Sequence, residues 1–486
     1  MQKSIKKNMI MSLILTTANF LFPLITFSYV ARVLSPVGTG RVAFVNSILS
    51  YFSYIAMLGI PMYGVREVAK VRDDKEKLSS LVHELLILNL LSTFIAYVLL
   101  LFAILCIPRL YSEKTLFIGM GTSIFLNTIG LEWVYQGLEE YSYITIRSIV
   151  FKIISVGLTF LLIRTEKDVL FYGFVHIFTN SASYIMNFFH VRKYIQLQHK
   201  RNYDLRKHIK PILTLFTASI IITIYSNFDV SMIGFISNDY EVGLYNSSLK
   251  IKHMVLAVSS AVTNVVVPRM SYYLKDGNNT KANSLIVKSF RVAMCLSLPI
   301  AVYIILFSNE CITFFCGYEY LGAIPSLKTS MICIIPLIFT NLFGNQILLP
   351  SGLEKRYSQS VFVGLWINLL LNSIMIPKLG AFGASIATLI TECWNVIWMS
   401  GGAKEYCSLL FKKINPLIYV ISLVGAISFS LFISNMVMDQ LFVKLAITAV
   451  SFFIAYYFIL FIEKEPLMYE QCHSILKKLK RLTQNK

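Results

Sequence analysis

The sequence predicts an all-α integral membrane protein with about fourteen transmembrane helices. The chain is strongly apolar, since 56% of its 486 residues are hydrophobic and its mean hydropathy is +0.66. Apolar runs recur almost end to end, and each is long enough to supply the roughly 20 residues that cross a hydrocarbon core. The runs are continuous rather than alternating, which favours helices over strands.

The apolar runs define the predicted helices in chain order. The first run follows three lysines and is similar to a signal peptide, but it is too long and lacks a small-residue cleavage site. We therefore expect it to be retained as the first helix. The predicted spans are residues 9–31, 42–62, 83–107, 115–136, 146–163, 169–190, 211–236, 244–268, 285–308, 325–348, 359–377, 381–402, 414–435 and 441–462.

Lys and Arg residues gather on alternate connecting segments, which fixes the predicted orientation. With the N-terminus in the cytoplasm, most of the 44 Lys and Arg residues fall on the inner side. This bias is typical of cytoplasmic loops, so we expect a multi-pass protein with both termini in the cytoplasm. The same bias accounts for the formal charge of +19, and no soluble segment is long enough to bind nucleic acid.

A weak internal repeat predicts two six-helix halves. Residues 40–47 open the second span, residues 243–248 open the eighth, and Pro61 and Pro268 close these two spans. Six helices per half is an even number, so the halves would insert in the same orientation about an axis along the membrane normal. The predicted organisation is an N-terminal bundle (1–195), a basic cytoplasmic linker (196–210), a C-terminal bundle (211–403), two further helices (404–462) and a basic cytoplasmic tail (463–486).

Cysteine and histidine spacing indicates no metal centre. The eight cysteines are scattered, and the sequence has neither a CxxC pair nor a cluster of His and Cys. We therefore expect no metal and no cofactor.

The ionisable residues inside the spans are the first candidates for function, because each is costly in a membrane and usually faces a cavity or a partner. Asp229 and Lys250 lie at similar depth, roughly 10 Å below the outer edge. They either form an ion pair or line one cavity. Lys252 points to another face of the same helix. Glu392 is the deepest acid, either a proton carrier or a structural acid, and Glu132 lies near an inner helix end.

Further cations lie near the outer ends of the spans. Arg32 and Arg41 flank the first outer loop, where they either snorkel or line the mouth of a cavity. Lys328 enters the tenth span from the same side. Together with Lys250 and Lys252, this set is mainly cationic, and a cationic cavity suits a phosphate or diphosphate cargo.

Several stretches resemble the polysaccharide-repeat-unit flippases (the Wzx or O-antigen transporter type), which belong to the multidrug/oligosaccharidyl-lipid/polysaccharide exporter superfamily. The resemblance covers the first twelve spans, and its parts are specific as a set. One departure is Ser35-Pro36, where the family often has Gly-Pro. The stretches are residues 29–40, 58–69, 132–140 with 143–147, Asp229 with 242–245, and 368–372 with 376–380 and 383–385.

The resemblance implies two pseudo-symmetric six-helix bundles around a central cavity that opens alternately to each side, in a bacterial plasma membrane. The implied cargo is a short glycan on a polyprenyl diphosphate, moved from the inner to the outer leaflet for O-antigen, capsule or exopolysaccharide assembly. By position, Arg32 and Arg66 match basic residues of the family and Asp229 matches its acid in the seventh helix. A polysaccharide polymerase complex is an implied partner.

Other functions are less well matched. A cation-coupled drug antiporter of the same superfamily is expected to hold deep acids in its first half, and the first span has none. A glycosyltransferase would need a DxD motif and a nucleotide-sugar domain, so we expect no enzyme. Two alternatives for the energy source stay open: transport without ion coupling, and coupling to a proton or sodium gradient.

Overall fold

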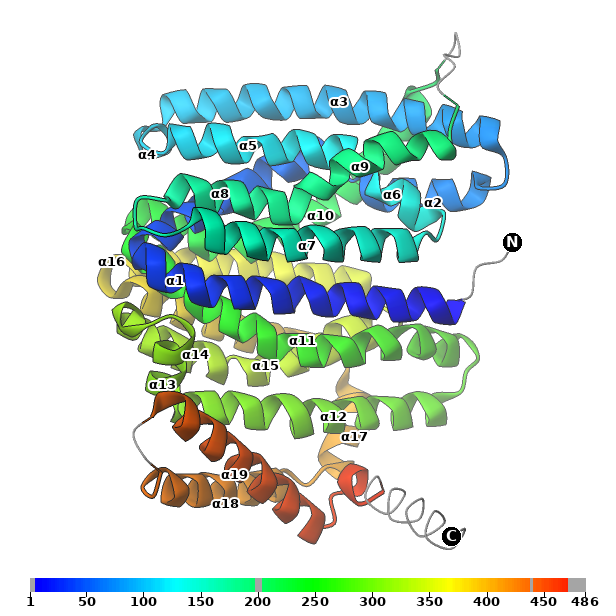
Figure 1. The fold of residues 1–486 in the computed structure, drawn as a ribbon. Coiled ribbons are helices and arrows are strands. Elements are labelled where there is room, and N and C mark those ends of the chain that lie inside the picture. The colour runs from blue at the N-terminus through cyan, green and yellow to red at the C-terminus, as the bar shows by residue number, and fades with distance from the viewer. Residues whose placement is uncertain (1–4, 197–202, 438–439, 471–486) are drawn as a thin grey trace, which may run out of the picture. The chain divides into compact units, whose positions relative to one another are not determined.

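The computed structural model describes residues 5–196, 203–437 and 440–470. This part of the chain is helical and has no strand (Figure 1), which confirms the predicted fold class. The middle of the predicted linker (197–202) and most of the predicted basic tail (471–486) lie outside the described residues.

The chain divides into two compact units at Asn246 and Ser247. The division falls after the predicted linker, so the first helix of the predicted C-terminal bundle packs within unit 1. Unit 1 contains α1 (Ile5–Met57), α2 (Ile60–Val71), α3 (Lys75–Cys106), α4 (Pro108–Tyr111), α5 (Lys114–Ile129), α6 (Glu132–Gly137), α7 (Tyr141–Leu162), α8 (Val169–Ile177), η1 (Phe178–Ala182), α9 (Ser183–His190), η2 (Val191–Lys193), α10 (Arg206–Ile236) and the first turns of α11 (Asp239–Lys275).

Unit 2 continues α11 and ends with a pair of apolar helices. The OH group of Tyr303 donates a hydrogen bond to the backbone oxygen of Leu445 at 2.8 Å, which fixes α12 to α19. The other elements of unit 2 are α12 (Asn279–Leu306), α13 (Ser308–Phe315), η3 (Tyr318–Ala323), α14 (Ile324–Ile332), α15 (Ile334–Thr340), η4 (Asn341–Leu348), α16 (Glu354–Ser400), α17 (Lys404–Lys413), α18 (Pro416–Ser434) and α19 (Leu441–Ile462).

Eight helical segments of the described chain are long and apolar enough to cross a membrane. Two of them, Ile25–Val71 and Glu354–Ser400, have 47 residues each and contain a break. Each is longer than one crossing requires, so one segment can supply more than one of the predicted spans. The chain is therefore a multi-pass membrane protein, and the exact count of fourteen stays a prediction.

The breaks in the long helices are sharper than predicted. Ser35 in α1 has φ 59° and precedes Pro36, and residues before proline avoid the helical region. The predicted outer loop at 32–41 is thus helical on both sides of a single residue. In α16 the break falls at Gly380, with φ 53°, three residues after Pro377.

Left-handed residues also shorten two predicted spans. Leu58 and Gly59 have positive φ angles and end the second predicted span before residue 62, so that α2 is a separate helix. Leu131 has φ 45° and separates α5 from α6. Glu132 therefore opens a short helix after this break rather than lying inside the fourth span.

The end of unit 1 where α2 and α3 meet is held by a buried polar bridge. His208 of α10 lies between Tyr63 of α2, whose OH group is 2.8 Å from Nδ1, and Glu84 of α3, whose carboxylate is 2.9 Å from Nε2. All three residues are buried. This bridge attaches the start of α10, which follows the predicted linker, to α2 and α3.

Helices α1 and α11 cross closely in unit 1, and we call this contact the glycine crossing. A Cβ atom at Gly40 of α1 would collide with the backbone oxygen of Asp239, and one at Gly243 of α11 with that of Pro36. The two glycines that mark the predicted repeat therefore meet at this crossing. Beside it, Glu113 accepts two hydrogen bonds from Arg41.

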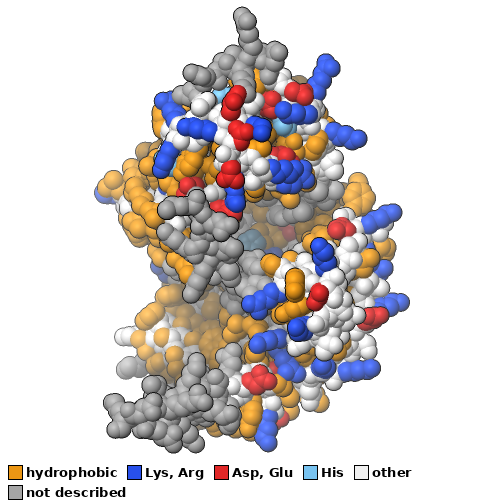
Figure 2. Space-filling model, turned by 90° about the vertical axis from the view of Figure 1, so that its right-hand side faces the viewer, with side chains coloured by type: hydrophobic (Ala, Val, Ile, Leu, Met, Phe, Trp, Pro, Cys, Tyr) orange, Lys and Arg blue, Asp and Glu red, His pale blue; other side chains and the backbone are white. Residues whose placement is uncertain are grey.

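Lys and Arg side chains are spread over the face shown in Figure 2, where they are blue. In unit 1, this face looks onto helix ends such as the start of α3 (Figure 1). In unit 1 the basic side chains at these ends include Arg66, Lys70 and Arg72, all largely exposed. The charge bias of the sequence predicts that these ends are cytoplasmic.

Candidate functional site

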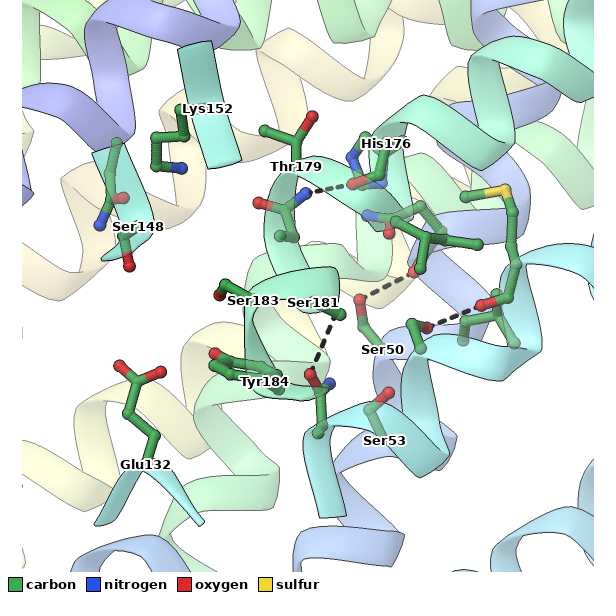
Figure 3. Close-up of a pocket in the computed structure, with 18 of the residues that line it drawn as sticks. Ser50, Ser53, Glu132, Ser148, Lys152, His176, Thr179, Ser181, Ser183 and Tyr184 are labelled. Carbon is green, nitrogen blue, oxygen red and sulfur yellow. Dashed lines mark hydrogen bonds between the residues drawn. The ribbon is translucent and has the colours of Figure 1, made fainter. Parts of the chain in front are cut away.

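A polar cavity of about 560 Å³ lies inside unit 1. It is built by α1, α5, α7, α8, η1 and α9, with Glu132 from α6 (Figure 3). Most of its lining side chains end in a hydroxyl or an amide, which can both donate and accept hydrogen bonds. These side chains are Asn19, Asn46, Ser50, Ser53, Ser123, Asn127, Ser148, Thr179, Asn180, Ser181 and Ser183.

A second cavity of about 470 Å³ adjoins the first. The two share the lining residues Ser53, Tyr54, Asn127, Glu132 and Tyr184. The second cavity adds apolar and aromatic side chains from the break between α1 and α2 and from α6, namely Met57, Pro61, Met62 and Trp133. A polar chamber therefore continues into an aromatic and apolar one on the side of α2.

The π-helix η1 shapes one wall of the polar chamber. A π-turn is wider than an α-turn, and such turns often occur at functional sites. The hydroxyl of Ser181 donates to the side-chain oxygen of Asn127 at 3.2 Å, and the amide of Asn180 donates to the backbone oxygen of His176 at 2.9 Å (Figure 3). Hydrogen bonds within the wall thus fix the side chains that line the chamber.

Glu132 is held in the wall by a buried arginine. Arg147 of α7 is only 2% exposed in its side chain and lies 3.3 Å from the Glu132 carboxylate. Its guanidinium also donates to the side-chain oxygen of Asn187 and lies 5.4 Å from the ring centre of Tyr184. The carboxylate therefore has a fixed position and a paired charge.

Lys152, one turn further along α7, also lines the polar chamber. The residue is 5% exposed. Ser148 is four residues earlier and faces the same way. Figure 3 shows Lys152, Ser148 and Glu132 on one side of the chamber, with Thr179 and Ser181 on the other.

Of the predicted site residues, Glu132 alone lines either of these two cavities. In unit 1, Arg41 is bound by Glu113 beside the glycine crossing, and Arg66 is exposed and lies 3.1 Å from Glu67. Arg32 is exposed on α1. Asp229 accepts a hydrogen bond of 2.5 Å from Tyr245, which links α10 to the start of α11.

The other predicted site residues lie in unit 2. Lys252 is 7% exposed and Glu392 is 4% exposed, whereas Lys328 is on the surface. Thr340 donates a hydrogen bond of 3.1 Å to the carboxylate of Glu392. Lys250 is half-buried on α11. The predicted pairing of Lys250 with Asp229 joins residues of different units and stays a prediction.

Sequence reasoning missed Lys152 and Arg147. Both lie within the fifth predicted span, 146–163, so the cost of a charge inside a membrane could have identified them. Their neighbours in the chamber come from six other helical elements, and a single sequence gives no sign of those contacts.

Proteins named as O-antigen transporters are among the curated relatives that are similar to this chain. The protein named "Putative O-antigen transporter" in Escherichia coli (strain K12) is 24% identical over 80% of this chain and 94% of its own length. Its namesake in Shigella dysenteriae is 24% identical over 82% of this chain and all of its own length.

Solved structures share the fold at low sequence identity. The lipid II flippase MurJ in an inward closed conformation superposes with a TM-score of 0.70 at 16% identity, covering 95% of this chain and all of that one. An inward-facing multidrug resistance transporter of the MATE family gives a TM-score of 0.61 at 13% identity. The superposition covers 81% of this chain and 96% of that one. These likenesses show that the chain shares the helical fold of these proteins.

Two family models match the sequence itself. The model named MatE matches residues 215–374. The model described as polysaccharide biosynthesis protein matches residues 5–274, which is more than half of the chain. The resemblance found in the sequence motifs is thereby confirmed, and the chain belongs to the polysaccharide biosynthesis protein family.

Proposed function

We propose that this protein is a flippase for oligosaccharide repeat units carried on a polyprenyl diphosphate. It moves them from the inner to the outer leaflet of a bacterial plasma membrane for assembly of a surface or extracellular polysaccharide. Both termini lie in the cytoplasm, and the product is passed to a polysaccharide polymerase complex. The O-antigen transporter relatives and the fold shared with a lipid II flippase support this cargo class.

The observation that carries the proposal is the polar chamber inside unit 1. A chamber lined by hydroxyls and amides offers a glycan the hydrogen bonds that it loses on leaving water. A volume of about 560 Å³ lies within the range of ligand sites. The polyprenyl tail needs no such chamber, because it can stay in lipid while the head group travels.

Transport by alternating access is the second part of the proposal. The close crossing of Gly40 and Gly243 supports a closed outer end of unit 1, while the chamber continues toward the side of α2. Such a site must open outward by a change between two discrete arrangements of packed helices.

The cationic central cavity is the third part of the proposal. Arg32, Lys250, Lys252 and Lys328 would meet the diphosphate, whose charge needs strong donors once water is removed. Arg41 and Arg66 would lie at its outer and inner ends. A proton or sodium gradient would act through the acids Asp229 or Glu392.

Reconstitution tests the proposal directly. The full chain would be placed in liposomes with a fluorescent polyprenyl-diphosphate trisaccharide, and a membrane-impermeant quencher would measure the fraction that crosses. We expect protein-dependent crossing in the wild type and its loss in Lys250→Ala and Arg32→Ala, with exposed Lys77→Met as the matched control. Equal crossing in all variants would contradict the proposed cationic cavity. If crossing does not exceed that in protein-free liposomes, the proposed flippase function is wrong.

A cation-coupled multidrug antiporter is the second candidate, because the MatE model matches residues 215–374 and multidrug transporters share the fold. The sequence of α1 contains no acid, which does not favour a cationic cargo. Export of a cationic dye that depends on Asp229 or Glu392 would favour this candidate over the flippase.

A further inference from the structure

The charges around the polar chamber of unit 1 do not balance. Its described lining contains one ammonium, one carboxylate and one imidazole, from Lys152, Glu132 and His176. Glu132 is already paired with Arg147, which is buried and approaches it from behind the wall at 3.3 Å. The pair is neutral as a whole, so Lys152 contributes a charge of +1 that this pair does not cancel.

Lys152 is buried and has no partner of its own among the described residues. The residue is 5% exposed, and in the described part of the chain its ammonium makes no hydrogen bond and no ion pair. Glu132 acts on it only through a longer-range electrostatic attraction. An ammonium holds three donors and no acceptor, so all three donors are available to a ligand in the chamber.

A buried and unpaired ammonium is costly, and the cost falls when an anion binds it. Removing an ion from water costs several kcal/mol in a protein, which only a close counter-charge with good geometry offsets. Inside a membrane such residues mark the path of a substrate. The facing wall supplies neutral hydroxyls and amides from η1, which suit the rest of a sugar (Figure 3).

We propose that Lys152 is the anion-binding residue of this chamber and that it takes an anionic oxygen group of the transported glycolipid. This inference rests on the proposed function and deepens it. Two sources share the chemistry, namely the carboxylate of an acidic sugar in the glycan and the diphosphate of the carrier. Lys152 selects for cargo with a negative charge at this point, and Arg147 keeps Glu132 from neutralising it.

Binding to a matched pair of probes tests the inference. The probes are a polyprenyl-diphosphate disaccharide that ends in glucuronic acid and the same lipid ending in glucose, which differ at one carboxylate. The full chain is held in lipid nanodiscs, and Kd is measured by fluorescence for the wild type, Lys152→Met, Lys152→Arg and the surface control Lys77→Met. Lys77 is 74% exposed in its side chain and is not one of the lining residues of the chamber.

We expect Lys152→Met to weaken binding of the acidic probe by about tenfold to a hundredfold, the value of charge-assisted hydrogen bonds, while Lys152→Arg restores most of it. If Lys152→Met weakens binding of the acidic probe alone, the group that Lys152 binds is the sugar carboxylate. If it weakens binding of both probes equally, that group is the diphosphate. If the wild type binds both probes and Lys152→Met changes neither Kd, the inference is overturned while the proposed function stands. If the wild type binds neither probe, the proposed function fails and this inference fails with it. Thermal unfolding of each variant confirms that a lost signal reflects binding and not misfolding.

Discussion

At the scale of single residues, the wall of the chamber depends on the pairing of Glu132 with Arg147. Replacing Arg147 by Met would leave the carboxylate without its guanidinium and the amide oxygen of Asn187 without its donor. An unsatisfied buried group costs about 1–3 kcal/mol. Glu132 is 27% exposed in its side chain toward the chamber, so we expect the lower end of that range.

A double-mutant cycle measures this pairing. We expect Arg147→Met to lower the unfolding temperature of the detergent-solubilised protein, and Glu132→Gln to lower it less because an amide oxygen still accepts from arginine. The unfolding temperature of the double variant should fall by less than the sum of the two single decreases, since the effects of residues in contact are coupled. Strict additivity would show that the two side chains do not interact.

Single residues were also where the sequence was least informative. The sequence marks Glu132 as a candidate because it is an acid near a helix end. Its partner Arg147 and the neighbouring Lys152 lie on another helix, α7. Arg41 is predicted either to snorkel or to line the mouth of a cavity, and in the structure its guanidinium is paired with Glu113. Depth follows from position along one helix, but the facing direction follows from packing between helices.

At the scale of elements, hydropathy located the helices well and their breaks poorly. The predicted spans 414–435 and 441–462 nearly coincide with α18 and α19. By contrast, the ends at Leu58 and Leu131 depend on left-handed backbone at leucines, which have no preference for it. The apolar pattern continues through both breaks, so hydropathy alone does not locate them.

The turn between α7 and α8 is stabilised by one carboxylate. Asp168 accepts hydrogen bonds from the backbone N–H groups of Arg164 and Thr165 at 2.9 and 2.8 Å. These donors hold the pKa of Asp168 below its ordinary value of 3.8. A lowered pKa means that the stabilisation is fully present above pH 3.8 and is lost as the pH falls through the folded-state pKa.

Melting curves test this turn. We expect Asp168→Ala to unfold at a slightly lower temperature than the wild type at pH 7, and the difference to shrink as the pH is taken below 3.8. Asp168→Asn keeps a hydrogen-bond acceptor and should lower the unfolding temperature less than Asp168→Ala does at pH 7. A difference between wild type and Asp168→Ala that stays constant down to pH 3 would contradict the role of the charged carboxylate.

At the scale of the whole molecule, we predict that an outward opening begins at the glycine crossing of unit 1. Asp239 and Gly243 belong to the first turns of α11, and the same helix runs on into unit 2. A side chain at Gly40 cannot fit while α1 and α11 are in contact, because its Cβ would lie 1.8 Å from the backbone oxygen of Asp239. A larger residue at this position therefore acts as a wedge between the two helices.

We expect Gly40→Val to shift the protein toward an outward-open arrangement. A reporter cysteine at Ser50, in the wall of the polar chamber, should then react faster with an impermeant thiol reagent added from outside the cell. The matched control is Gly157→Val on α7, where a Cβ would have no neighbour within 4 Å. Both proteins carry the same Ser50→Cys change, and labelling is compared at equal expression. If the wedge leaves labelling at the level of the control, the crossing is a fixed structural contact, and the outer route to the chamber must lie elsewhere. Faster labelling together with slower glycolipid transport would place the crossing on the path of alternating access, because a population held outward can no longer load from the cytoplasm.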